Sequence, residues 1–209
     1  MVPTVLVDPN TFFERRSDNP GWLWPTVIVI LAALVGIVGS VPVFLATIRS
    51  MPEAAGGVSV LIVVVGSIGG VIGTLVFWVL YAIAFHAISS VGFGGVGPFS
   101  RTLKLTGWGF IPHVFSGIVS AAANFYVFSG VSFPSDPVRI GQFVSSLRSD
   151  PVLLIVQALG IAFLLWSAFL WVFAIHHGRD VTVREATISV GIPVLVVILF
   201  RLYNIVGGL

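Results

Sequence analysis

Histidine is the side chain in this sequence best suited to metal binding or proton transfer, and the chain has four of them. His86, His113, His176 and His177 all fall near the ends of apolar segments, on one side of a membrane in the topology derived below. Four imidazoles at one interface could form a metal site or a proton path. No two are four residues apart, however, and no carboxylate lies inside an uncharged stretch to share such work. We therefore expect histidines that pack at the interface, and neither a metal site nor a cofactor.

Other catalytic groupings are missing from the sequence. It has no Ser-His-Asp arrangement, no paired carboxylates for acid–base catalysis and no cysteine for thiolate chemistry. The glycine-rich segment 92–98 lacks the Gly-Lys-Ser/Thr ending of a phosphate-binding loop. The net charge of +2 is too weak and too dispersed for nucleic-acid binding. We therefore expect a protein that is not an enzyme and that binds no nucleic acid.

Long uncharged stretches make up most of this chain and separate its charged segments. Charged residues make up only 9 % of the sequence, against about 25 % in soluble domains. Four stretches exceed the roughly 20 apolar residues that cross a hydrocarbon core of ~30 Å. A fifth, 186–200, reaches that length only if Arg201 lies at the interface with its guanidinium among the headgroups. These stretches predict an all-α polytopic membrane protein with five transmembrane helices.

The chain divides into a short cytoplasmic or interfacial head, residues 1–23, and a five-helix transmembrane domain, residues 24–209. The uncharged stretch 54–100 is too long for one span and awkward for two, so we expect one long helix followed by a glycine-rich loop. The expected spans are residues 25–48, 58–89, 105–128, 151–176 and 184–205.

Basic residues are distributed unequally between the two sides of the membrane. With five spans, six lie on the side of the head and four on the other. Because cytoplasmic loops carry an excess of Lys and Arg, we expect the N-terminus in the cytoplasm. The six are Arg15, Arg16, Arg101, Lys104, Arg179 and Arg184, and the four are Arg49, Arg139, Arg148 and Arg201.

The sequence predicts two interaction surfaces, a glycine-lined helix face for packing and a basic and apolar surface for binding lipid or a partner. Glycines four residues apart let a neighbouring helix approach closely, and we favour packing within the chain over a homodimer seam for Gly66, Gly69, Gly70 and Gly73. Basic side chains beside apolar ones on the cytoplasmic side suit anionic lipid headgroups, at roughly 1 kcal/mol per basic residue, and equally an acidic patch on a partner. That surface comprises Phe12, Phe13, Arg15, Arg16, Arg101, Lys104, Arg179 and Arg184.

Several segments, in this order, resemble the Yip family (Ypt-interacting proteins, the Yip-one domain), especially its prokaryotic branch. The head Leu6-Val-Asp-Pro-Asn-Thr-Phe-Phe13 is similar to the D-P-x-x-F-F opening of the family. The segments 94–103 and 106–112 resemble its glycine loop and the G-Y-x-x-x-P beginning of its third helix. Arg184-Glu-Ala186 and Pro193 resemble the beginning of its last helix.

The resemblance implies a small, five-span membrane protein with a cytosolic N-terminus, in the cell membrane of a prokaryote. Eukaryotic members help organise membrane traffic and contact Rab-type GTPases. This chain lacks their Asp-Leu-Tyr-Gly-Pro element and their long cytosolic domain, which argues against GTPase binding. We expect a non-enzymatic protein that acts through helix packing, self-association, or binding of membrane lipids or another membrane protein, in membrane organisation or traffic.

A small transporter or channel subunit is the alternative function, with Pro42, Pro112 and Pro193 opening a polar path. Ion-coupled transporters usually place an ionisable residue near the midplane, and the first four expected helices have none. Gln157 and Asn124 are their strongest polar groups, and we expect each to bond across helices. A water-lined cavity that reaches the midplane would favour the alternative, whereas a tightly packed bundle would favour the first function.

Overall fold

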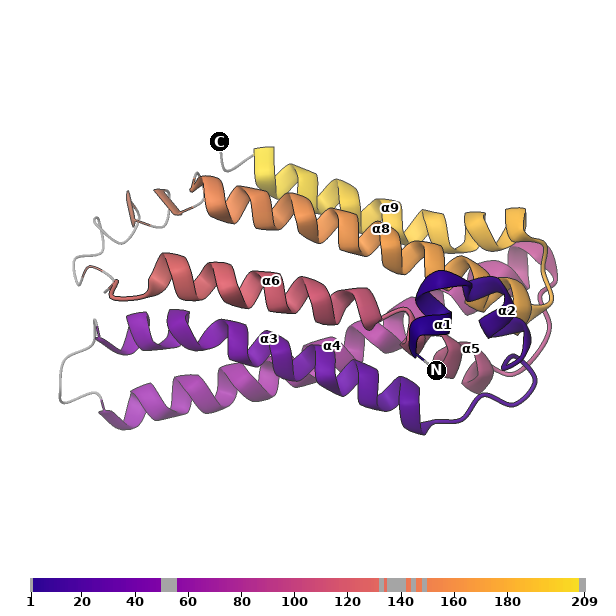
Figure 1. The fold of residues 1–209 in the computed structure, drawn as a ribbon, viewed down its shortest axis with the longest axis horizontal. Helices are drawn as coiled ribbons and strands as arrows, with labels where there is room; N and C mark the ends of the chain where they lie inside the picture. The colour runs from indigo at the N-terminus through magenta and orange to yellow at the C-terminus, as the bar shows by residue number, and fades with distance from the viewer. Residues whose placement is uncertain are drawn as a thin grey trace.

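The computed structural model describes residues 2–49, 56–131 and 150–206, together with positions 134, 142–143 and 146–147. Within these residues the regular structure is helical, and five helices are long and apolar enough to cross a membrane. The prediction of an all-α, five-span bundle is thereby confirmed. The five long helices lie along the long axis of the molecule (Figure 1). They are α3 (Leu23–Arg49), α4 (Gly56–Phe93), α6 (Ile111–Phe128), α8 (Pro151–Arg179) and α9 (Val183–Val206).

Three shorter helices gather at one end of the bundle: α1 (Val2–Val7), α2 (Pro9–Glu14) and α5 (Phe99–Trp108) (Figure 1). We call this end the cap, and it also includes loop 94–98 and the link 180–182 between α8 and α9. Asp8 begins α2 by accepting a hydrogen bond of 3.1 Å from the backbone N–H of Thr11. Hydrogen bonds from Thr11 hold the pKa of the Asp8 carboxyl below its usual range. The opposite end, where α3 ends and α8 begins, is called the open end.

The third span differs from the expected helix over residues 105–128. The chain turns at Gly109 and Phe110, so α5 and α6 are separate helices and the span begins at Ile111. Gly109 lies against the indole of Trp171, where an added Cβ would come within 2.0 Å of Nε1. Pro112 stands in the first turn of α6. Backbone N–H groups in a first turn have no acceptor within the helix, so the N–H that proline lacks costs no helical hydrogen bond. Residues 105–108 therefore belong to the cap and not to the span.

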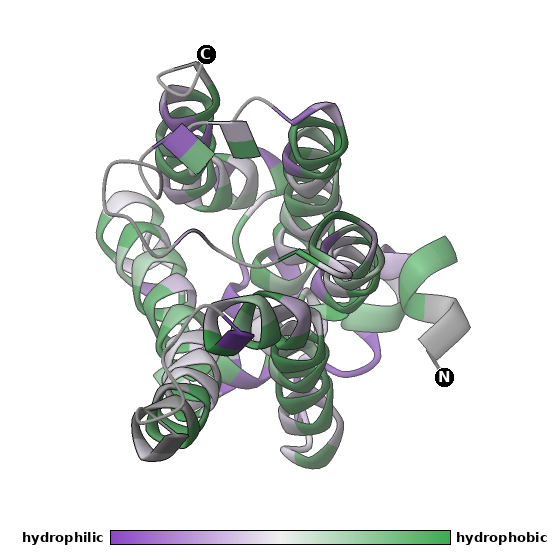
Figure 2. Cartoon of the chain, turned by 90° about the vertical axis from the view of Figure 1, so that its left-hand side faces the viewer, coloured by the Kyte–Doolittle hydropathy of each residue, from purple (hydrophilic) through white to green (hydrophobic). Residues whose placement is uncertain are grey.

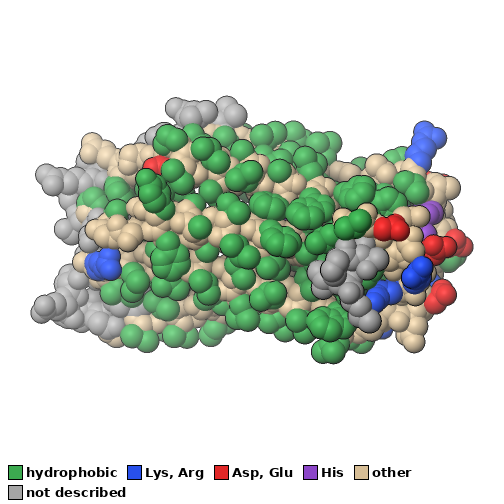
Figure 3. All heavy atoms as spheres, viewed as in Figure 1, with side chains coloured by type: hydrophobic (Ala, Val, Ile, Leu, Met, Phe, Trp, Pro, Cys, Tyr) green, Lys and Arg blue, Asp and Glu red, His purple; other side chains and the backbone are tan. Residues whose placement is uncertain are grey.

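Burial and charge are divided between the cap half and the flanks of the bundle. Large side chains that are fully buried, such as Phe85, Leu105 and Trp171, lie towards the cap. Apolar side chains cover the flanks of the long helices, while charged side chains gather at the ends (Figures 2 and 3). An apolar flank matches a hydrocarbon surrounding, in which helices satisfy their own backbone hydrogen bonds. The chain is thus a multi-pass membrane protein.

The contact between Gly109 and Trp171 gives a test of the α5–α6 turn. Gly109→Ala places a methyl group against the indole and should destabilise the bundle by about 1–3 kcal/mol, the usual effect of overpacking. Thermal unfolding in detergent should show this as a lower midpoint. Gly191→Ala in α9 is the matched control, because no atom lies within 4 Å of an added Cβ there. Equal midpoints for the two variants would show that this contact does not hold the turn.

Candidate functional site

The cap is organised around a buried arginine at the end of α8. Arg179 is only 2 % exposed, and its guanidinium reaches both the end of α4 and the glycine-rich loop. The backbone carbonyl of Arg179 also accepts a hydrogen bond of 2.9 Å from the N–H of Val96. Arg179 therefore ties the end of α8 to the end of α4 and to the loop that follows it, 82 to 90 residues earlier in the sequence. The guanidinium donates to the hydroxyls of Ser89 and Ser90 and to the carbonyls of Gly95 and Gly97.

Two indoles hold α5 in place from the other side. Trp171 of α8 donates from Nε1 to the carbonyl of Thr106 at 2.7 Å. Trp78 of α4 donates from Nε1 to the carbonyl of Leu103 at 2.9 Å. Neither tryptophan was singled out from the sequence. The available signal was Gly109, since a glycine admits a large ring, here that of Trp171, close to the backbone.

Three residues of the predicted binding surface are buried, which corrects that prediction. Phe13 and Arg179 are buried, and Phe12 is only 4 % exposed. The ring of Phe12 packs edge-on against Trp108 with centroids 4.8 Å apart. The D-P-x-x-F-F segment therefore closes the cap against the bundle and does not dip into headgroups. Its phenylalanines gain more by packing on α5 and α8 than at a half-wet interface, because packing removes them from water entirely.

The remaining members of that surface form a basic rim around the cap. Lys104 places its ammonium 4.9 Å from the ring centroid of Trp22. Trp22 and Trp24 are about half exposed at the beginning of α3, where an aromatic belt marks the boundary between membrane and water. The rim comprises Arg15, Arg16, Arg101, Lys104 and Arg184, of which Arg15 and Arg184 are exposed and the other three are partly buried.

The glycines of α4 are divided between two faces of the helix. An added Cβ at Gly66 would come within 2.8 Å of Phe44 on α3, and one at Gly70 would make a single contact at 4.0 Å. Nothing lies within 4 Å of an added Cβ at Gly69 or Gly73. Gly66 therefore permits a close approach of α3 and α4, whereas Gly69 and Gly73 lie on a face without a helix partner. Self-association through that face stays a prediction.

The four histidines do not converge on one site. Within the described residues no group of three potential metal ligands lies together. Each imidazole instead bonds a different neighbour, which pins one segment to another. The partners are Thr102 for His86 at 3.0 Å, Ser167 for His113 at 2.9 Å, the Val181 carbonyl for His176 and Asn10 for His177 at 2.8 Å.

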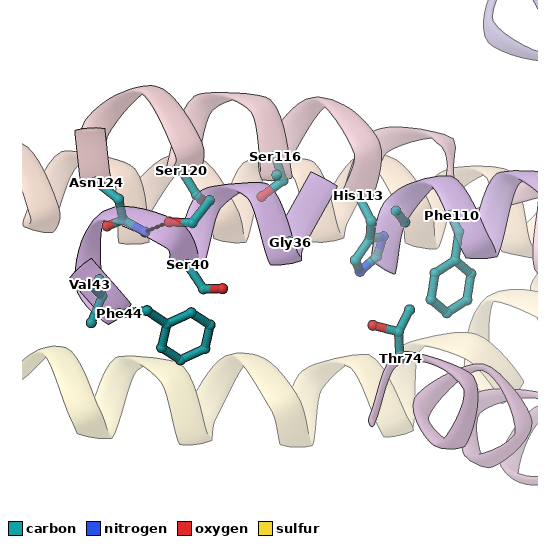
Figure 4. A pocket seen from close by; sticks show the side chains of 13 residues that line it. Gly36, Ser40, Val43, Phe44, Thr74, Phe110, His113, Ser116, Ser120 and Asn124 are labelled. Carbon is teal, nitrogen blue, oxygen red and sulfur yellow. Dashed lines mark hydrogen bonds between the residues drawn. The ribbon is translucent and has the colours of Figure 1, made fainter. Parts of the chain in front are cut away.

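A crevice of about 380 Å³ enters the bundle between α3, α4 and α6 (Figure 4). Asn124 on its wall donates to the carbonyl of Gly39 at 2.9 Å, which is the interhelical bond expected of this residue. Towards the cap the crevice ends at Phe110, whose ring is almost fully buried and lies beside Trp171. The polar side chains that line it are Ser40, Thr74, His113, Ser116, Ser120 and Asn124.

Comparison with known proteins places these features within one sequence family. The sequence profile of the Yip1 domain matches residues 4–203, which include α2, the whole cap loop and nearly all of the five long helices. An uncharacterized protein of the archaeon Methanocaldococcus jannaschii is 26 % identical over 125 residues, which cover 58 % of this chain and 86 % of that protein. No solved structure matches the chain.

The hydrogen bonds of Arg179 predict a large loss of stability on its removal. Arg179→Gln removes the charged donor of four hydrogen bonds, and a hydrogen bond to a charged group contributes about 1.5–3 kcal/mol. We expect a clearly lower midpoint of thermal unfolding and faster proteolysis of the loop over 94–98. Arg184→Gln is the control, because that arginine is exposed five residues further along the chain. Similar midpoints for the two variants would contradict an organising role for Arg179.

Proposed function

The chain belongs to the Yip1 domain family, and we propose that it is a non-enzymatic membrane protein whose cap binds anionic lipid headgroups. The observation that carries this proposal is the position of Lys104 beside Trp22. A tryptophan at the beginning of a span marks the depth of the headgroups, so the ammonium next to it lies at the same depth. We further propose that the cap faces the cytoplasm of a prokaryotic cell, where anionic lipids attract basic residues.

The composition of α5 supports lipid binding at this depth. The helix contains Arg101 and Lys104 and no acidic residue, while its residues Leu105 and Thr106 are buried in the cap. One side of α5 thus packs on protein and the other presents two cations. At roughly 1 kcal/mol each, two basic residues favour an anionic lipid over a neutral one by about 30-fold. A local pool of anionic lipid is a means of organising a membrane that needs no chemical step.

The crevice of Figure 4 favours a second candidate, a small transporter or channel subunit. Its wall is rich in hydroxyl groups and lies within the spans. The aromatic rings of Tyr81, Phe85 and Trp171, with centroids within 6 Å of one another, fill the bundle beyond Phe110. A space closed towards the cap is better suited to holding a molecule than to conducting one.

Reconstitution in liposomes tests the two candidates against each other. Purified protein should show no hydrolase activity and no flux of solutes, because the crevice ends at the buried Phe110 on the side of the cap. Flux should be measured with a panel of small ions and neutral solutes at increasing concentration. A reproducible flux that saturates with solute concentration would favour the transporter and count against the lipid-binding proposal.

Charge reversal on α5 tests lipid binding at the cap directly. Arg101→Glu with Lys104→Glu should lower the enrichment of spin-labelled phosphatidylglycerol around the protein in mixed bilayers at least tenfold, without lowering the unfolding midpoint. The control exchanges the two residues, Arg101→Lys with Lys104→Arg, which keeps the charge and alters only the side-chain shape. Unchanged enrichment after charge reversal, or an equal loss in the exchanged control, would refute recognition of headgroups by charge.

A further inference from the structure

Arg201 is partly buried, and its side chain turns inward from α9 towards α8. Its guanidinium faces α8, because a Cβ added to Gly160 would come within 3.1 Å of Nη1. Gly160 follows Asp150, the residue that begins α8 at the open end, by ten positions or roughly 15 Å of helix. Half of a ~30 Å hydrocarbon core is the same length. Gly160, and with it the guanidinium, therefore lies well inside the candidate span Pro151–Arg179 and not at its end.

The surroundings of Arg201 explain how such a charge is tolerated. Within the described part of the chain the guanidinium has no carboxylate partner and no hydrogen bond. It lines instead a second crevice of about 500 Å³ between α4, α6 and α9, together with Thr74, Tyr81 and His113. A charged group inside a membrane is costly and usually marks a functional site. Here the guanidinium lies against Gly160 of α8 and also lines an open space.

The spaces around Arg201 adjoin one another. Thr74 and His113 line both this crevice and that of Figure 4. On the other side of Arg201, a smaller space of about 170 Å³ adds the amides of Gln157 and Asn204. The guanidinium thus stands at the centre of a chain of hydroxyl, imidazole and amide groups. Such groups bind the oxygens of a phosphate or a glycerol.

The crevice opens sideways towards the lipid. Phe77, Val196 and Phe200 line it, and each is more than half exposed on the flank of the bundle. A wall made of lipid-facing side chains gives access from the bilayer, between α4 and α9. Phe110, which lines the crevice on the side of the cap, is almost fully buried. A molecule that enters by this route must be soluble in hydrocarbon and must also carry a polar group.

We propose that this crevice binds the phosphate-bearing headgroup of one anionic phospholipid, with Arg201 as the phosphate ligand. A guanidinium is permanently charged and matches two phosphate oxygens with two N–H groups. The acyl chains leave between α4 and α9, beside Phe77 and Val196. The described wall offers no carboxylate to a choline or ethanolamine, so an anionic lipid binds in preference to a zwitterionic one. This site is separate from the basic rim of the cap and extends the proposed function.

Native mass spectrometry of the purified protein tests the site. After exchange into detergent with equal amounts of phosphatidylglycerol and phosphatidylcholine, the wild-type chain should retain one phosphatidylglycerol, and Arg201→Gln should lower that retention at least tenfold. Arg49→Gln, which removes an exposed arginine at the open end, should leave it unchanged. Val196→Trp fills the lateral opening and keeps Arg201, so it should also lower retention, and it decides the matter if Arg201→Gln does not fold.

Three results would overturn the proposal. The first is that the wild type and both crevice variants retain the same amount of phosphatidylglycerol. The second is that the wild type retains phosphatidylglycerol and phosphatidylcholine equally. The third is that millimolar inorganic phosphate displaces the lipid, which would indicate a site for small anions. The α5 charge-reversal variant should keep its bound phosphatidylglycerol in this experiment. Failure of the crevice site and failure of the cap surface are thereby distinguished.

Discussion

The hydrogen bonds made by the last three turns of α8 hold the rest of the structure in register. Arg179 binds the end of α4 and the glycine-rich loop, and Trp171 binds the backbone of α5. Because α5 is fixed in this way, the chain turns at Gly109 and α6 begins where it does. That turn sets Phe110 at the closed end of the crevice and His113 on its wall. The geometry of the crevice thus depends on contacts made in the cap.

Arg179 and Arg201 both turn a guanidinium away from water, and they differ in how its N–H groups find acceptors. Hydrocarbon offers no partner to a guanidinium, so its N–H groups need acceptors from the protein or from something else. Arg179 finds its acceptors in two hydroxyls and two carbonyls and serves the fold. Arg201 has none of these within the described residues and faces a space. A residue that is supplied with acceptors is structural, whereas one left without them points to a ligand.

The sequence predicts the five spans well because hydrophobic length is a local property of the chain. It fails where the outcome depends on partners distant in sequence. Leu105 to Phe128 is apolar enough to read as one helix, and only contact with Trp171 reveals the turn. Arg179 reads as a surface residue until Ser89, 90 positions earlier, is placed beside it. Arg201 stands near the end of its apolar stretch, but the sequence does not reveal that its side chain turns towards Gly160 of α8.

The anchoring of the cap by α8 has a consequence for how the protein is made. Synthesis delivers the head, the glycine-rich loop and α5 before α8 exists. Until the fourth span has entered the membrane, α2 lacks its packing against α8, and the carbonyls of Thr106 and Gly95 lack their donors Trp171 and Arg179. The cap therefore closes late, and a ribosome that stalls before residue 171 leaves an exposed apolar end for quality-control proteases to recognise.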